Sequence, residues 1–165
     1  MTIGVLINPT GAGYFDAAPS IGNQHVQVVV DVNSSALPKG TSVELEAYAG
    51  PGTGNPPTIP YVQASSATAD SLGLGVIVGG ETAANATSIA GGAVATVLTE
   101  GICQVLCDAT TVAGYPLIQS AATSGALKCT SAGAAPTAGR GYGVALQSVT
   151  ISSGTALVWA YIRAQ

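Results

Sequence analysis

The same order of short runs rich in β-branched residues occurs twice along this chain, and this repetition restricts the fold more than any other feature. The first copy lies within residues 24–100 and the second within residues 101–165. Each copy ends with a strand, a turn, a Gly-Val strand, a second turn and a closing strand. The matched positions are Asp31 with Asp108, Gly75 with Gly143, and Thr96 with Leu157. The first copy is longer because its loops are longer, and loops tolerate insertion.

The repeated runs predict strands and not helices. No stretch of about eleven residues repeats apolar positions at helical spacing without an intervening Gly or Pro. Turn clusters at 38–40, 112–114 and 152–154 separate the runs, and the Gly/Pro-rich segment 49–60 predicts a surface loop. Residues 81–89 are predicted to form a loop or a single turn. The predicted strands are 3–7, 26–32, 41–47, 74–78, 93–98, 102–107, 142–146 and 156–162.

The two units are predicted to share one compact body. Neither unit has enough large apolar side chains to form a stable core of its own. We therefore predict an all-β chain in which the tandem units 24–100 and 101–165 pack into one β-barrel or β-sandwich.

The opening segment, residues 1–23, has no counterpart in the second copy. Its apolar side chains predict an extended N-terminal arm that docks on a neighbouring subunit by strand addition. An ordinary edge strand of the same domain is the alternative. The predicted contact residues are Ile3, Val5, Ile7, Tyr14 and Phe15.

Charged residues make up only 7% of the chain, whereas an ordinary soluble domain has about 25%. The four cations are scattered and the net charge is -4, which argues against nucleic acid as a partner. Low charge with high apolar content also argues against disorder. No membrane span is predicted, because Gly114 and Pro116 interrupt the longest uncharged run, 109–127. Residues 1–15 lack the Lys or Arg of a secretory signal.

The chain has three cysteines, and this odd number predicts free thiols and not a framework of disulfides. Cys103 and Cys107 share one face of a predicted strand but lie about 13 Å apart, beyond bonding distance. We predict buried thiols that act as small apolar groups, with a bridge from Cys129 to one of them as the alternative. Synthesis in a reducing compartment fits this usage.

Alternation along the predicted strand 41–47 places two carboxylates on the solvent side. The inward positions are Val43, Leu45 and Ala47, and the outward positions are Glu44 and Glu46. The paired carboxylates are therefore predicted to be a solvated strand face and not a catalytic pair.

No other group of residues suited to catalysis or metal binding occurs together in the sequence. His25 is the only histidine, and it lacks the partners of a catalytic site or, with Cys103 and Cys107, of a zinc site. The glycines between Gly73 and Gly80 lack the strand and helix of a dinucleotide fingerprint and are interpreted as strand glycines that allow close backbone approach. We predict no catalytic residues, no metal, no cofactor and no enzymatic activity.

Four short motifs follow one another at spacings typical of one family. They are Gly75-Val76-Ile77-Val78, Thr99-Glu100-Gly101-Ile102, Gly125-Ala126 and Gly143-Val144-Ala145-Leu146. In this order, across residues 26–162, the chain resembles the small capsid decoration (cement) proteins of tailed bacteriophages. It departs from them in its longer 49–60 loop, its 81–92 connection and its cysteines.

The resemblance implies a homotrimer on the outer surface of an icosahedral virion, at local three-fold positions, where it stabilises the shell. The implied partners are the major capsid protein and other copies of the chain, which the arm residues would contact. The alternative is a phage fibre component or a carbohydrate-binding β-sandwich module. Tyr48 and Tyr61, at the two ends of the Gly/Pro-rich loop, favour that alternative because aromatic platforms suit sugars.

Overall fold

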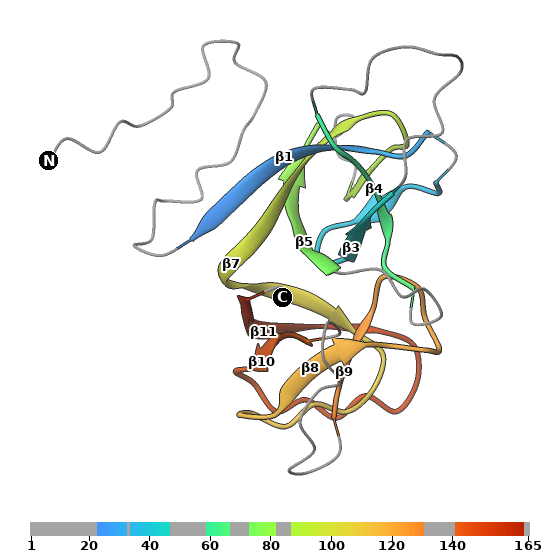
Figure 1. Cartoon of the computed structure of the whole chain (residues 1–165). Coiled ribbons are helices and arrows are strands. Elements are labelled where there is room, and N and C mark those ends of the chain that lie inside the picture. Colours follow the sequence, from blue (N-terminus) through green and yellow to red (C-terminus); the bar gives the residue numbers. More distant parts are fainter. Residues whose placement is uncertain are drawn as a thin grey trace, which may run out of the picture.

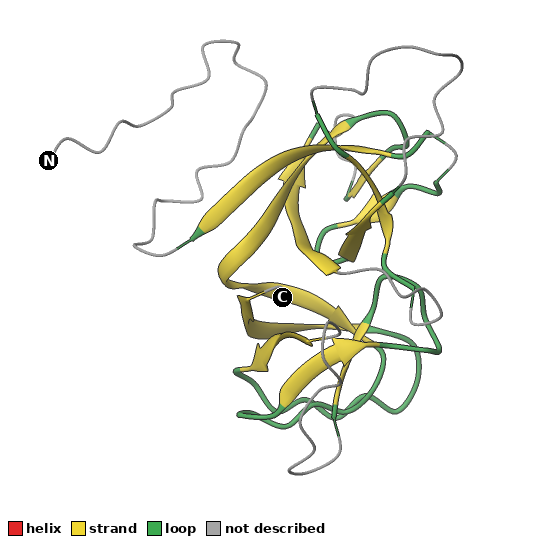
Figure 2. Ribbon diagram, viewed as in Figure 1, coloured by secondary structure: helices red, strands yellow, loops and turns green. Residues whose placement is uncertain are grey.

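The described part of the chain consists of strands, turns and loops, without a helix (Figure 2). The computed structural model describes residues 23–32, 34–46, 59–66, 73–81, 87–130 and 141–163. The all-β prediction is confirmed. A search of these residues for a helix long and apolar enough to cross a membrane finds none. The predicted strand 3–7 and most of the 49–60 loop lie outside the described residues.

Each half of the chain contributes its own strands, and β7 belongs to both halves. The strands before it are β1 (Gln24–Val30), β2 (Leu37–Pro38), β3 (Ser42–Leu45), β4 (Tyr61–Ala64), β5 (Gly73–Gly80) and β6 (Ser88–Ile89). The shared strand is β7 (Val94–Cys107). The strands after it are β8 (Pro116–Gln119), β9 (Leu127–Cys129), β10 (Gly141–Ala145) and β11 (Ala156–Arg163).

The main sheet closes on itself twice. The order β1-β4-β3-β5-β7 closes where β1 pairs with β7, and the order β7-β11-β10-β8-β9 closes where β9 pairs with β7. Figure 1 shows the two closed groups one above the other, with β7 running through both. The predicted compact barrel is therefore two small barrels that share one strand.

Strand pairings in the first barrel have counterparts in the second. In the first unit, β1 pairs in parallel with β4 and antiparallel with the closing strand, the first half of β7. In the second unit, the second half of β7 pairs in parallel with β9 and antiparallel with the closing strand β11. In the first unit, β3 pairs antiparallel with β4 and with β5. In the second unit, β8 pairs antiparallel with β9 and with β10 in the same way. These matches agree with two tandem related units, although the boundary at residue 100 stays a prediction.

Equivalent turns make the same hydrogen bonds. The backbone N–H of Gly40 donates to the Ile77 carbonyl, and that of Gly114 donates to the Ala145 carbonyl, both at 2.8 Å. The two glycines have φ values of 90° and 87°, in the region that glycine adopts without a steric penalty. The turn glycines are thus required by the same local geometry in both units.

One matched pair of the sequence alignment is wrong by two residues. Gln27 pairs with Thr96 in the first barrel, and Gln104 pairs with Trp159 in the second. Thr96 therefore corresponds to Trp159 and not to Leu157. A shift of two residues leaves the same side chains facing inward, so the apolar pattern did not reveal it.

Two predicted segments differ from the structure. The separate strands expected at 93–98 and 102–107 are one continuous strand, β7, which crosses from one barrel to the other. Gly101 has a φ of 137°, and a Cβ there would lie 1.9 Å from Asn23 Oδ1, so glycine lets the ladder continue past a close contact. Within the predicted loop 81–89, Ser88–Ile89 forms the short strand β6, which pairs with β2.

The predicted exposure of two residues in β3 is also wrong. Glu44 is fully buried and Leu45 is 52% exposed, the reverse of the prediction. The ladder between β3 and β5 shifts register between Val43 and Glu44, but the extra residue lies in β5, and β3 pairs with β4 without a shift. The alternation of β3 is therefore kept, and the exposure of each side chain depends on what covers it. Glu44 Oε1 accepts a hydrogen bond from Gln63 Nε2 and Oε2 accepts one from the Ser66 backbone, both at 3.1 Å. Glu46 is half-buried, and Ala47 lies outside the described residues.

Each barrel has its own apolar core, and the two cores are joined. Val76 and Leu98, from strands of the first barrel, pack into the core of the second. Tyr142 of β10 is fully buried, and its hydroxyl donates to the Val43 carbonyl of β3 at 3.2 Å. A Cβ at Gly73 would lie 2.2 Å from the Tyr142 ring, so the glycine makes room for this contact. The two barrels thus form one packed body.

Candidate functional site

Large apolar side chains stand exposed on the outer face of the second barrel. We call this surface the β7–β11 face; its outward residues are Ile102, Gln104 and Leu106 of β7 and Leu157, Trp159 and Tyr161 of β11. Ile102 is 55% exposed, Leu157 46%, Trp159 48% and Tyr161 36%. These residues lie directly opposite one another across the antiparallel pair, as Ile102 with Tyr161 and Leu106 with Leu157. Such a contiguous exposed apolar patch is typical of an interaction surface.

Burial in the barrel decides which side chains of β11 point outward. Val158, Ala160 and Ile162 are fully buried in the barrel, so the residues between them must face solvent. β10 extends the face on its other side, because Val144 lies opposite Tyr161 and the Leu146 backbone N–H donates to the Trp159 carbonyl at 2.8 Å. Leu146 is 47% exposed.

Charge is confined to one end of the face. Glu100 and Arg163 are paired across β7 and β11 at that end. The Tyr161 hydroxyl donates to Glu100 Oε1 at 2.9 Å, and this hydrogen bond is the main reason that the pKa of Tyr161 is raised. Beyond this polar end the face presents Gln104 among apolar side chains, so binding to it depends on shape and apolar burial more than on ion pairs.

The cysteines behave as predicted, as unbridged thiols. Cys103 and Cys107 are buried and free, and Cys129 is half-buried and free. Burial raises the pKa of Cys103 and of Cys107 to about 12. Thiols with so high a pKa are unreactive near neutral pH, because the thiolate is the nucleophilic form.

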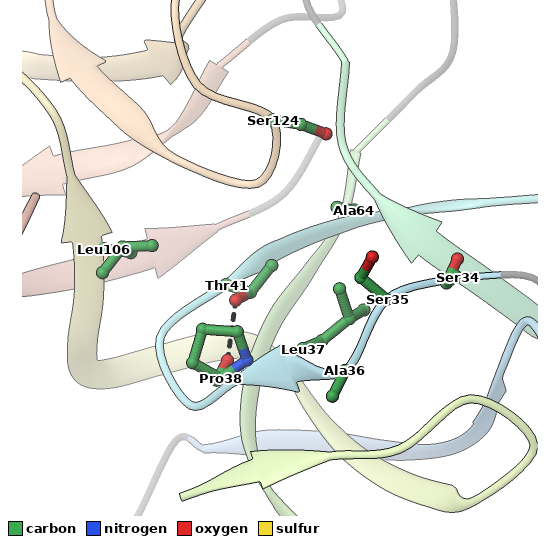
Figure 3. Close-up of a pocket in the computed structure, with 9 residues that line it drawn as sticks. All are labelled: Ser34, Ser35, Ala36, Leu37, Pro38, Thr41, Ala64, Leu106 and Ser124. Atoms are coloured by element: carbon green, nitrogen blue, oxygen red, sulfur yellow. Dashed lines mark hydrogen bonds between the residues drawn. The ribbon is translucent and has the colours of Figure 1, made fainter.

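The pocket between the two barrels offers no chemistry of its own. It has a volume of about 360 Å³ and is lined by Ser34, Ser35, Ala36, Leu37, Pro38, Thr41, Ala64, Leu106 and Ser124 (Figure 3). None of these side chains titrates, and the Thr41 hydroxyl already donates to the Pro38 carbonyl at 2.7 Å (Figure 3). We therefore place the candidate site on the β7–β11 face, which adjoins this pocket at Leu106, and not in the pocket itself.

The titratable side chains that the sequence singled out do not form a site either. His25 lies on β1 opposite Leu98, and partial burial lowers its pKa. Burial, followed by the charges of Asp31 and Glu44, raises the pKa of Glu46. A search of the described residues for groups of three or more metal-binding side chains finds none. The absence of enzymatic activity stays a prediction.

All five predicted arm contacts fall in the part of the chain that the structure does not describe. Ile3, Val5, Ile7, Tyr14 and Phe15 lie outside the described residues, as does Tyr48 of the predicted sugar platform. The sequence analysis missed the β7–β11 face because both sets of alternate residues in 156–162 are apolar. The one available signal was size: the outward set is large and the inward set includes two small or medium residues, Val158 and Ala160.

Comparison with known proteins gives structural similarity without a sequence match. No known protein family and no curated protein matches the chain. Among solved structures, the chain is similar to one described as the N base of head fiber gp8.5 in bacteriophage phi29. The sequences are 11% identical, the TM-score is 0.48, and the match covers 85% of this chain and 93% of that chain.

Proposed function

We propose that this protein is a structural component of a tailed-phage virion, bound to the outer surface of the capsid as a homotrimer at local three-fold positions. Shell stabilisation is its role in this proposal. The observation that carries the proposal is the exposed, nearly uncharged β7–β11 face, whose aromatic side chains are of the kind that dominate binding energy at protein interfaces. The sequence resemblance to capsid decoration proteins supplies the partner, the major capsid protein.

The low charge of the chain supports assembly through apolar contact. With 7% charged residues, few ion pairs are available to be screened by salt. Many copies on one shell would turn modest individual affinities into lasting attachment.

Co-sedimentation with undecorated heads of the phage that encodes the protein tests this function. We expect binding that changes little between low and high salt, and a trimer by mass measurement in solution or on the shell. Trp159→Ser should weaken binding at least about tenfold, as expected for loss of an aromatic anchor. Val32→Ser, a change of an exposed side chain on the first barrel, is the matched control and should bind normally. A monodisperse monomer without affinity for the heads would refute the proposal.

A carbohydrate-binding role, in a fibre or another module, is the second candidate. Trp159 and Tyr161 lie two residues apart on one face of β11, an arrangement on which sugar rings could stack. A glycan array separates the two functions. Reproducible hits that disappear in Trp159→Ser would favour sugar binding over capsid binding.

A further inference from the structure

Gln104 is an exposed polar side chain in the middle of the apolar β7–β11 face. It lies between Ile102 and Leu106 on the outward side of β7, and it stands opposite Trp159 of β11. The charged end of the face lies further along the strand, at Glu100. The Gln104 carboxamide is therefore bordered by apolar and aromatic side chains.

The equivalent side chain of the first barrel has a hydrogen-bond partner. Gln27 Nε2 donates to Thr96 Oγ1 at 3.0 Å across β1 and β7. In the second barrel the residue equivalent to Thr96 is Trp159, whose side chain has no hydroxyl group. Within the part of the chain that the structure describes, no residue forms a hydrogen bond with the Gln104 carboxamide. The partner that the amide has in one barrel is thus replaced in the other by an exposed aromatic side chain.

An amide in this position restricts what can bind the face. A partner that covered the face with apolar groups alone would remove the C=O and N–H groups of Gln104 from water without replacing their hydrogen bonds. Leaving such groups unpaired weakens a complex by about tenfold or more. The partner must therefore present a donor and an acceptor beside an apolar group that packs on Trp159.

An extended main chain meets this requirement. The N–H and the C=O of one extended residue point to the same side of the chain, so that residue can donate to Gln104 Oε1 and accept from Nε2 together. Alternate side chains of the segment point to one face, where they can pack on Trp159 and Ile102. The peptide group is uncharged, which suits a surface whose charged residues lie at one end. A single hydroxyl group has only one proton to donate, and a charged side chain would be buried without an opposite charge.

We infer that the β7–β11 face binds an extended main-chain segment of the shell protein, whose peptide groups pair with the Gln104 carboxamide while an apolar side chain packs on Trp159. This inference rests on the proposed function, because the face is the one proposed to bind the shell. Trp159 supplies affinity as an aromatic anchor. Gln104 supplies specificity, because it disfavours purely apolar partners and favours a segment with free peptide groups.

Head binding by Gln104→Leu tests the role of the amide. Leucine is similar in size and suits an apolar face, so a partner that only packs on the face would bind this variant at least as tightly. We expect binding to weaken about tenfold instead, because the hydrogen bonds are lost and the peptide group of the partner is left unpaired. Gln27→Leu, the same change at the equivalent position of the first barrel, is the matched control and should bind normally.

Gln104→Glu is a second variant that keeps the size of the side chain. It replaces the N–H donor with a charged acceptor, so it should also weaken head binding about tenfold or more. Far-ultraviolet circular dichroism and the fluorescence maximum of Trp159, the only tryptophan, should stay unchanged in every variant because position 104 is exposed. Unchanged head binding by both Gln104 variants would overturn the inference.

Electron cryomicroscopy of decorated heads identifies the group that faces the amide. The expected contact joins the Gln104 carboxamide to main-chain N–H and C=O groups of the shell protein. A hydroxyl group, a charged side chain or a sugar in that place would overturn the inference. A dimer of the free protein that Gln104→Leu dissociates would assign the amide to a second copy and would overturn it as well.

The same experiments separate this inference from the proposed function. If the unchanged protein does not bind heads, both are refuted. If the unchanged protein and Gln104→Leu bind heads equally well, capsid binding stands and only the role of Gln104 is refuted.

Discussion

The two barrels differ most at equivalent positions on their outer faces. In the first barrel Gln27 stands opposite Thr96, and Gln27 Nε2 donates to Thr96 Oγ1 at 3.0 Å. In the second, the equivalent Gln104 stands opposite Trp159, which is 48% exposed. One copy of the fold thus carries a polar pair where the other carries an exposed aromatic side chain. Inward positions specify the barrel, whereas outward positions are free to diverge into a binding surface.

The largest expected difference between the barrels concerns Tyr142 and its first-barrel equivalent, Leu74. Tyr142 is fully buried between the barrels, whereas Leu74 is only partly buried. We expect Tyr142→Ala to lower the free energy of unfolding by about 3–5 kcal/mol, from lost burial and the cavity left behind. Leu74→Ala should cost less because it leaves a smaller void. Urea unfolding measures both changes.

Tyr142→Phe is the control for the hydroxyl. It removes the bond to the Val43 carbonyl but keeps the ring, so it should cost about 1 kcal/mol. Equal losses for Tyr142→Ala and Leu74→Ala would show that Tyr142 does not join the barrels.

A smaller difference should appear at alkaline pH, because all three cysteines lie in the second unit. Burial raises the pKa of Cys103 and Cys107 from 9.0 to about 12, so the folded state keeps both thiols neutral where the unfolded chain ionises. Their stabilisation is therefore present below pH 9 and is lost as the pH rises from 9 towards 12. Each thiol contributes at most about 1.4 kcal/mol per pH unit to this loss.

Unfolding measured at a series of pH values from neutral to alkaline checks this slope. In Cys103→Ala/Cys107→Ala the free energy of unfolding should fall less steeply above pH 9. Identical slopes for this variant and the unchanged protein would contradict buried, neutral thiols in the second barrel.

The smallest expected effect on stability comes from exchanging the outer residues of the two faces. Trp159→Thr and Thr96→Trp should each change the free energy of unfolding by about 0.5 kcal/mol or less, because both positions face solvent. Head binding should weaken at least about tenfold in Trp159→Thr and should not recover in the double variant, whose tryptophan stands on the wrong barrel. Recovery of binding by the double variant would show that a tryptophan on either barrel suffices.

Much of the fold was predictable from local patterns. Short β-branched runs between glycine turns predicted the positions of β1, β3, β5, β10 and β11 and of both parts of β7. The repeated order predicts two related units, and Gly40 and Gly114 adopt the same turn geometry in them. The buried positions of Cys103 and Cys107 followed from simple alternation.

Three features escaped prediction because they depend on neighbouring strands. Glu44 is buried, where it accepts hydrogen bonds from Gln63 and Ser66, and Leu45 is exposed, although each residue fits the opposite pattern in sequence. Gly101 lacks a Cβ that would clash with Asn23, so one strand continues through both barrels where two were expected. The candidate site escaped because β11 is apolar on both sides, so its outward side was set by which residues the barrel could enclose.

The sequence by itself determined the all-β class, the duplication and the scarcity of charge, since these rest on residue type and spacing along the chain. Only the tertiary structure decided that the barrels share β7 and that Trp159 and Tyr161 face outward. The physical reason is that both sides of β11 are apolar, and the closed barrel can enclose only the side whose side chains are small enough to fit its core. Val158, Ala160 and Ile162 fit inside, so the larger aromatic side chains were left on the surface.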